Sequence, residues 1–186
     1  MRKLFFLLMI CLPYLAGAQA PVRPERKGFT AGFSLGAGLL SVSTRDTAQT
    51  GAAFTFPNLR IGYLLREDLA LCLLIPGSVY RYQDKPRGFE GVLLSAQYWP
   101  ADRWWLLGGA GMALDAPAFW TVREPRRTDF HTGFPALAAA AGFELWRSRR
   151  FALDLQYRFY TGRAALAGGG QRRGWSQMGS IGFNWY

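Results

Sequence analysis

Residues 151–160, FALDLQYRFY, alternate between apolar and polar side chains over their whole length. One parity carries Phe151, Leu153, Leu155, Tyr157 and Phe159, and the other carries Ala152, Asp154, Gln156, Arg158 and Tyr160. Because successive side chains of a strand point to opposite sides of a sheet, this period of two predicts a β-strand with two chemically different faces. The apolar face either packs in the core of a soluble protein or contacts lipid on the outside of a barrel with a polar interior.

Eight segments with this strand character follow one another along the chain, and no comparable helical period interrupts them. They are residues 28–43, 52–65, 69–82, 89–99, 104–114, 134–146, 151–163 and 174–186. Short turns at 66–68, 100–103 and 147–149 alternate with longer loops at 45–51, 83–88, 115–133 and 164–173. The predicted fold class is all-β: an eight-stranded antiparallel up-and-down transmembrane β-barrel with short periplasmic turns, longer extracellular loops and both termini on the short-turn side.

The placement of bulky side chains favours lipid over a soluble core. In residues 29–39 and 137–145, bulky apolar residues alternate with small or polar ones. A soluble eight-stranded ligand carrier shows the reverse, with bulky apolar side chains inside and charges outside. Charged residues are nearly absent from the outward parity of the strand middles, where a charge in hydrocarbon costs about 2 to 4 kcal/mol. We therefore expect the face from Phe151 to Phe159 to contact lipid.

Aromatic residues gather beside the short turns and at the C-terminus, and a second set lies beside the long loops. Tryptophan and tyrosine are enriched where a membrane meets water. We expect six residues near the short turns to be interface aromatics: Trp99, Trp104, Trp105, Trp146, Trp185 and Tyr186.

Residues 1–18 have the pattern of a cleaved secretory signal peptide. Arg2 and Lys3 precede an apolar run that is shorter than the roughly twenty residues a spanning helix needs, and small residues follow it. Cleavage after Ala18 leaves a short N-terminal segment, 19–27, ahead of the barrel, 28–186. The predicted location is the outer membrane of a Gram-negative cell envelope, reached by export.

The net charge and the numbers of cysteines and histidines limit the possible partners, disulfides and metal sites. The net charge is +10 at pH 7 without a basic helix, which favours anionic lipid over nucleic acid as the partner. Cys72 is the only cysteine outside the signal peptide, so no internal disulfide is available. His131 is the only histidine and lies in a predicted loop beside Asp129. We expect no metal site and no cofactor.

The inward parity of the strands carries four charged residues: Arg60, Glu144, Asp154 and Arg158. An eight-stranded barrel is just wide enough for side chains to fill it, so we expect a packed polar core rather than a channel. Because buried charges have to be paired, we expect an ion network of Glu144, Arg158 and Asp154 between the sixth and seventh strands. A gate or a proton path is the alternative role of these residues.

Arginines in the longest predicted loop, and arginines that flank the seventh and eighth strands at the long-loop end, are candidates for binding lipid phosphate. They are Arg123, Arg126, Arg127, Arg163, Arg172 and Arg173. Arginine binds phosphate through paired, charge-assisted hydrogen bonds, and the expected partner is lipopolysaccharide in the outer leaflet. The alternative is that these charges only solvate exposed loops.

The closing segment WSQMGSIGFNWY, residues 175–186, places Ile181, Phe183 and Trp185 at one parity and an aromatic residue last. With eight alternating strands, it resembles the small eight-stranded outer-membrane barrels of the OmpA/OmpX type. The resemblance covers essentially the whole chain after the signal peptide and departs from many members in ending Trp-Tyr rather than in a single Phe. It implies assembly by the barrel-assembly machinery and a monomer in the outer membrane.

The stretch LQYRFYTGRAALAGGG, from residue 155, is also similar to the penultimate-strand region of outer-membrane lipid A deacylases. That family's motif places a His and a Ser two residues apart before an Asn, where this chain has Phe159, Thr161 and Gly162. A serine-type hydrolase needs a nucleophile beside a base, so we expect no catalytic residues. The sequence favours a non-catalytic structural or surface-interaction role, with a degenerate lipid A-modifying relative and a soluble periplasmic binding barrel as alternatives.

Overall fold

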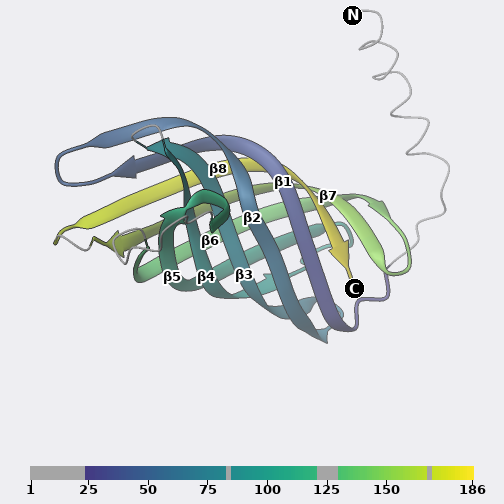
Figure 1. Cartoon of the computed structure of the whole chain (residues 1–186). Coiled ribbons are helices and arrows are strands. Elements are labelled where there is room, and N and C mark those ends of the chain that lie inside the picture. Colours follow the sequence, from purple (N-terminus) through teal and green to yellow (C-terminus); the bar gives the residue numbers. More distant parts are fainter. Residues whose placement is uncertain (1–23, 83–84, 121–129, 167–168) are drawn as a thin grey trace, which may run out of the picture.

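The chain folds into one closed antiparallel barrel (Figure 1). The computed structural model describes residues 24–82, 85–120, 130–166 and 169–186; the predicted signal peptide lies outside them. Each strand pairs with its neighbours in sequence, and β8 closes the barrel against β1. The strands are β1 (Gly28–Ser43), β2 (Ala48–Arg66), β3 (Leu69–Tyr82), β4 (Lys85–Tyr98), β5 (Trp104–Pro117), β6 (His131–Arg147), β7 (Phe151–Ala165) and β8 (Gln171–Trp185). The predicted fold class is confirmed.

Four strands begin earlier at the long-loop end than their apolar pattern predicts. For example, β2 begins at Ala48 and pairs it with Ser43, and β4 begins at Lys85 and pairs it with Tyr82. The predicted loops 45–51 and 83–88 are therefore partly strand. Strand pairing continues past the apolar segments because it needs only backbone N–H and C=O groups. The alternation of apolar and polar side chains ends earlier, where the outward face no longer has apolar surroundings.

The two faces of the barrel differ in chemistry along every strand. On β7, Leu155 is 50% exposed on the outside, and its neighbour Gln156 is 7% exposed inside. The outside displays exposed Phe, Leu, Ile, Tyr and Trp side chains, and the inside buries arginines, carboxylates and amides. The barrel thus has an apolar exterior and a polar, packed interior.

Inward glycines make room for the largest interior side chains. A methyl group at Gly142 on β6 would meet the ring of Trp105, and one at Gly174 on β8 would meet the ring of Phe89. Both aromatic side chains are fully buried. Each large ring therefore packs against a glycine on another strand, and the rings fill the cross-section of the narrow lumen.

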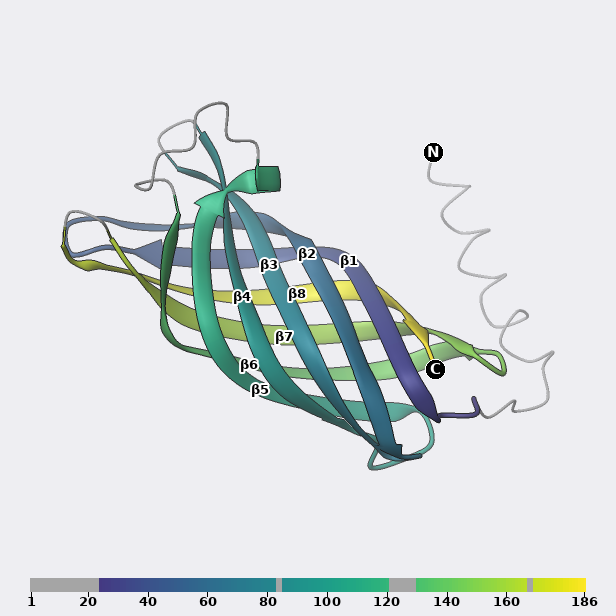
Figure 2. The ribbon, with the colours of Figure 1, turned by 60° about the horizontal axis from the view of Figure 1, so that its bottom comes forward.

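Both ends of the described chain lie at the short-turn end, which we call the inner end. The backbone of Glu25 donates to Arg149, and that of Tyr186 donates to Arg150, both in the turn between β6 and β7. At the opposite, outer end, the short 3-10 helix η1 (Ala118–Trp120) follows β5 (Figure 2). Phe119 has a left-handed backbone (φ 58°), and its ring packs 4.9 Å from that of Phe56 on β2. Within the described residues, no helix is long and apolar enough to cross a membrane.

Candidate functional site

A buried carboxylate at the inner end accepts hydrogen bonds from three side chains and forms a further ion pair. Arg26 Nη2 lies 2.9 and 2.8 Å from the two oxygens of Glu144 on β6. Trp99 Nε1 and the Tyr186 hydroxyl donate to Oε1 over 3.0 and 2.8 Å. Arg147 completes the set, 3.9 Å from Oε2. We call Arg26, Trp99, Glu144, Arg147 and Tyr186 the inner cluster.

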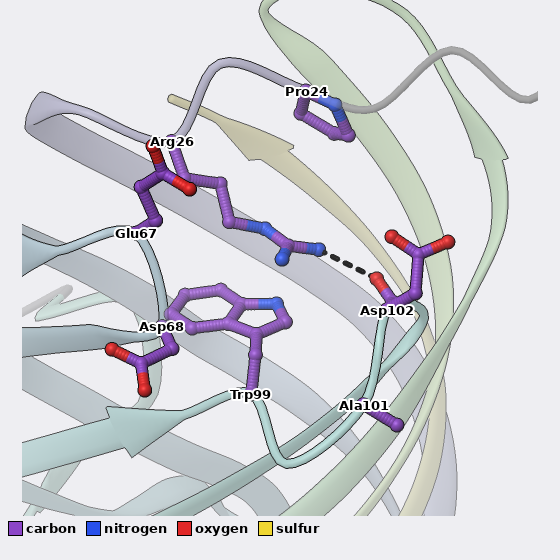
Figure 3. Close-up of a pocket in the computed structure, with 7 residues that line it drawn as sticks. All are labelled: Pro24, Arg26, Glu67, Asp68, Trp99, Ala101 and Asp102. Carbon is purple, nitrogen blue, oxygen red and sulfur yellow. Dashed lines mark hydrogen bonds between the residues drawn. The ribbon is translucent and has the colours of Figure 1, made fainter.

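Arg26 covers the inner end of the lumen as a lid (Figure 3). Its guanidinium lies 4.7 Å from the centre of the Trp99 ring and 5.6 Å from that of Tyr186, and it donates to the Asp102 carbonyl over 3.0 Å. Stacking on aromatic faces and pairing with a carboxylate are the two contacts that suit a planar guanidinium. A residue of the segment before β1 therefore covers the inner end of the lumen. No periodic pattern in the sequence predicts that Arg26 lies there.

A shallow pocket of about 310 Å³ surrounds this lid at the inner end of the barrel. Its lining is Pro24, Arg26, Glu67, Asp68, Trp99, Ala101 and Asp102 (Figure 3). Arg66 donates to Asp68 over 2.9 and 2.6 Å in the exposed β2–β3 turn and holds the pKa of that carboxyl below its usual value. Arg147 pairs with Asp102 over 2.9 Å. Two of the three lining carboxylates thus already have partners.

The six predicted interface aromatics separate into two groups. Trp104, Trp146 and Trp185 are exposed on the outside, and their place at a membrane interface stays a prediction. Trp99, Trp105 and Tyr186 are buried inside, so their assignment to the interface is wrong. The reason is strand alternation: neighbours such as Trp104 and Trp105 point to opposite faces, and closeness to a turn does not decide which face.

The middle of the lumen, which we call the middle layer, holds Arg60, Asp154 and Arg158 among neutral amides. Asp154 accepts from Trp105 Nε1 over 2.8 Å, from Gln156 Nε2 over 2.8 Å and from Asn184 Nδ2 over 2.7 Å. Arg60 donates to Gln97 and Asn184, and its guanidinium lies 5.8 Å from the Trp105 ring centre. Side chains from β5, β7 and β8, among them the Trp105 indole, therefore donate to one carboxylate.

The four charged residues predicted inside the barrel do lie there, but Glu144, Arg158 and Asp154 do not pair with one another as predicted. All four residues, Arg60, Glu144, Asp154 and Arg158, are buried inside the barrel. Glu144, however, is bound by Arg26, and Arg158 donates to the neutral Gln156 over 3.2 Å. The register explains the difference, because Glu144 faces Asp154 across the β6–β7 ladder and Arg158 faces Ala140 farther along it. Two carboxylates in register cannot pair, so each draws donors from elsewhere in the lumen.

At the outer end, Asp115 on β5 forms an outer cluster inside the lumen. Arg87 Nε donates to it over 2.9 Å, the Tyr80 hydroxyl donates over 3.2 Å, and Arg172 forms a second ion pair with it. Arg172 is therefore turned inward, and its assignment to lipid phosphate is wrong. Its neighbours on β8 explain this, because the odd-numbered residues, including Trp175 and Ile181, are the ones exposed outside.

Arg163 and Arg173 lie outside, in register with each other on β7 and β8. With Pro135, Leu137, Thr161 and Gly162 they line a groove of about 350 Å³ on the outer wall, which we call the rim groove. Arg163 Nε donates to the Phe134 carbonyl. The other three phosphate candidates, Arg123, Arg126 and Arg127, lie outside the described residues.

The positions that match the deacylase motif hold no catalytic geometry. Phe159 faces outward, and the Thr161 hydroxyl donates to the Gly174 carbonyl over 3.0 Å. Neither side chain can act as a base. Across the described residues, no three His, Cys, Asp or Glu side chains lie close enough together to hold a metal ion.

No family model and no curated protein sequence matches the chain. Among solved structures it is similar to Neisserial surface protein A, with 18% identity, a TM-score of 0.58 and coverage of 85% of this chain and 96% of that one. It is also similar to Ail, the attachment invasion locus protein of Yersinia pestis (15% identity, TM-score 0.47, 84% and 99% covered). A third is the outer membrane protein OprG from Pseudomonas aeruginosa (10% identity, TM-score 0.43, 88% and 98% covered).

Proposed function

We propose that this chain, which has the fold of the small eight-stranded outer-membrane barrels, is an integral outer-membrane protein with a closed lumen and no catalytic role. The observation that carries the proposal is the opposite chemistry of the two faces. Large apolar side chains such as Leu94 and Ile181 are exposed outside, and Arg60, Asp154 and Glu144 are buried inside. A soluble binding barrel would gain nothing from an apolar exterior, whereas a lipid-embedded barrel requires one.

The filling of the lumen supports a non-conducting barrel. The fully buried Trp105, Phe89 and Tyr160 lie inside it, between the clusters at its two ends. A void of only about 10 Å³ lies beside Arg60 and Arg158, which is room for one water-sized particle. Ions crossing the barrel would have to displace the Arg26–Glu144 pair and these rings together.

The rim groove supports a surface-interaction role toward lipid. Arg163 and Arg173 present two exposed guanidiniums where the outward face meets the outer rim, and Leu137 and Pro135 beside them are apolar. Trp175 follows on the same face of β8, one outward position toward the middle of the barrel, where an interface tryptophan belongs. This arrangement suits a phosphate on the arginines and an acyl chain against the wall, which is the chemistry of lipopolysaccharide.

The fold also supports assembly as a monomer by the barrel-assembly machinery. The closing strand β8 carries the exposed Ile181 and Trp185 on its outward face and pairs with both β1 and β7, so the barrel is complete within one chain. A closed barrel leaves no unpaired strand edge for a second copy.

Membrane fractionation tests the proposal. The chain should remain with the outer membrane after a carbonate wash, and the unheated folded form should migrate faster than the boiled form on a gel. Recovery in the soluble periplasmic fraction would instead favour a soluble binding barrel. Mass analysis of lipid A after incubation with the chain tests the enzyme alternative, and an unchanged mass is the result that the proposal predicts.

A further inference from the structure

The charges inside the barrel are balanced at both ends and unbalanced in the middle. At the inner end, Arg26 and Arg147 face the carboxylates of Glu144 and Asp102. At the outer end, Arg87 and Arg172 pair with Asp115, and the carboxylate of Glu90 is buried on the same strand as Arg87. The middle layer has two guanidiniums, Arg60 and Arg158, and one carboxylate, Asp154.

The one carboxylate of the middle layer does not pair directly with either arginine. Its hydrogen bonds come from Trp105, Gln156 and Asn184. Among the residues that the structure describes, Arg158 has one hydrogen bond, to the amide oxygen of Gln156, and Arg60 donates to two more amides. A buried guanidinium held only by neutral groups is costly, because amide dipoles do not replace the charge of a carboxylate.

Unsatisfied polar atoms concentrate at this same level. Of the seven buried side-chain nitrogen and oxygen atoms without a partner in the described chain, five belong to the middle of the lumen: Asn58 Oδ1, Arg60 Nε, Gln97 Nε2, Arg158 Nε and Ser180 Oγ. The void of about 10 Å³ is lined there by Ser34, Asn58, Arg60, Gln156, Arg158 and Asn184, together with Gly32, Phe33 and Leu59 of β1 and β2. Three of these residues, Asn58, Arg60 and Arg158, line the void. Buried polar atoms are normally satisfied, so a group that contacts these three is expected in the void.

We propose that this void binds one small monovalent anion, chloride under physiological conditions. One negative charge balances the two guanidiniums against Asp154, and the N–H groups of Arg60 and Arg158 are its donors. The amide of Asn58 supplies a further N–H when its oxygen and nitrogen exchange places, an orientation that the hydrogen-bond network decides. A water molecule fits the same space but supplies no charge. The anion is therefore a structural component of the lumen, acquired when the barrel closes.

The first test is diffraction from crystals of the full folded chain grown with bromide as the only halide. The proposal predicts an anomalous scattering peak inside the lumen, within hydrogen-bond distance of the guanidiniums of Arg60 and Arg158. Density at that place without an anomalous signal, which denotes water, would overturn it.

The second test is the urea unfolding midpoint of chain refolded separately in chloride and in gluconate at equal ionic strength. Refolding in each salt ensures that the anion present when the barrel forms is the only one available to the void. A ligand of the folded state raises stability with its concentration, so the wild-type midpoint should rise steadily with chloride and stay flat with gluconate, which is too large for the void. Equal midpoints in both salts would contradict the site.

Asn58→Asp supplies the missing charge in nearly the same shape. In this variant the midpoint should lose its dependence on chloride, and the bromide peak should disappear. Gln171→Glu adds the same charge at an exposed position of β8 and should keep both. If Asn58→Asp does not fold, Arg158→Gln removes the excess positive charge instead and should also abolish the dependence. Retention of the full chloride dependence in the folded variant would refute the proposal.

Discussion

Arg26 Nη2 lies 2.8 Å from Glu144 Oε2, so a residue that precedes the first strand supplies the counter-charge of a carboxylate buried in the sixth. The pair joins segments that are 118 residues apart in the chain and sits on the ring of Trp99. The N-terminal segment is thereby a part of the barrel interior.

Arg26→Ala should destabilise the folded barrel by about 3 to 5 kcal/mol, because it leaves the Glu144 carboxylate buried without its cation. Urea unfolding in lipid vesicles, followed by tryptophan fluorescence, measures the loss. The control is Lys27→Ala, which breaks only the exposed pair with Glu25 and should change stability by less than about 1 kcal/mol. The double variant Arg26→Met with Glu144→Gln should recover part of the loss. Equal effects of the two single alanine changes would show that the lid is not coupled to the carboxylate.

Gly142→Ala should lower the free energy of unfolding by about 1 to 3 kcal/mol, since the new methyl group would overlap the buried Trp105 ring. Gly179→Ala is the matched control, because a methyl group at that outward glycine meets nothing within 4 Å. The same unfolding experiment compares the two. A tolerated Gly142→Ala would mean that the ring is not packed against β6.

Leu155→Arg and Ala165→Arg place the same charge on the same face of β7 at two depths. Leu155 lies deep in the apolar exterior, and Ala165 lies at the outer end of the strand. We expect Leu155→Arg to cost about 2 to 4 kcal/mol and Ala165→Arg at most about 1 kcal/mol. Folded yield, measured as the fraction of heat-modifiable form, reports both. Similar yields would remove the argument for a hydrocarbon environment around Leu155.

Gln156→Ala, which the strand parity alone predicts to be tolerated, acquires a different expectation from the structure. Gln156 donates to Asp154 over 2.8 Å and accepts from Arg158 over 3.2 Å, so it bridges two buried charges. Its removal should cost about 1 to 3 kcal/mol in the unfolding free energy. A neutral effect would indicate that Asp154 and Arg158 pair directly once the amide is gone.

Replacing Arg163 and Arg173 together with Gln should lower lipopolysaccharide co-purification about tenfold, because two charge-assisted contacts with phosphate are lost. Arg81→Gln is the control, since it removes an exposed arginine from β3 near the same end of the barrel. The heat-modifiable form should persist in all variants, so a loss of lipid binding is separable from a loss of folding. Unchanged co-purification at low and at moderate salt would show that these arginines are exposed to solvent and do not bind lipopolysaccharide.

The strands were predictable because an apolar exterior around a polar interior imposes a period of two over their whole apolar length. The inner ends of β1, β3, β5 and β7 begin where that pattern begins. The same alternation contains the signal that Trp105 and Arg172 point inward, since their neighbours Trp104 and Arg173 carry the outward parity. The prediction groups residues by their closeness to a turn or a loop instead, and so assigns Trp105 and Arg172 to the wrong face.

The partners inside the lumen were less accessible to sequence reasoning. Glu144 is bonded by Arg26, Trp99 and Tyr186, which come from three separate parts of the chain. Their meeting depends on barrel closure and on the register shift in β6 between Glu144 and Trp146. Arg26 lies before the first periodic segment, so no pattern assigns it to either face.

Three pairs of adjacent leucines show whether the outward face of this barrel contacts lipid while the inward face does not. Leu73 is 45% exposed and Leu74 is 1% exposed; Leu94 is 69% exposed and Leu93 is buried; Leu106 is 50% exposed and Leu107 is 5% exposed. Nuclear Overhauser effects between lipid acyl-chain protons and leucine methyl groups, measured on the wild-type chain in lipid nanodiscs, distinguish the members of each pair. We expect lipid contacts for Leu73, Leu94 and Leu106 and none for Leu74, Leu93 and Leu107. Contacts from the second set, or from neither, would contradict this expectation.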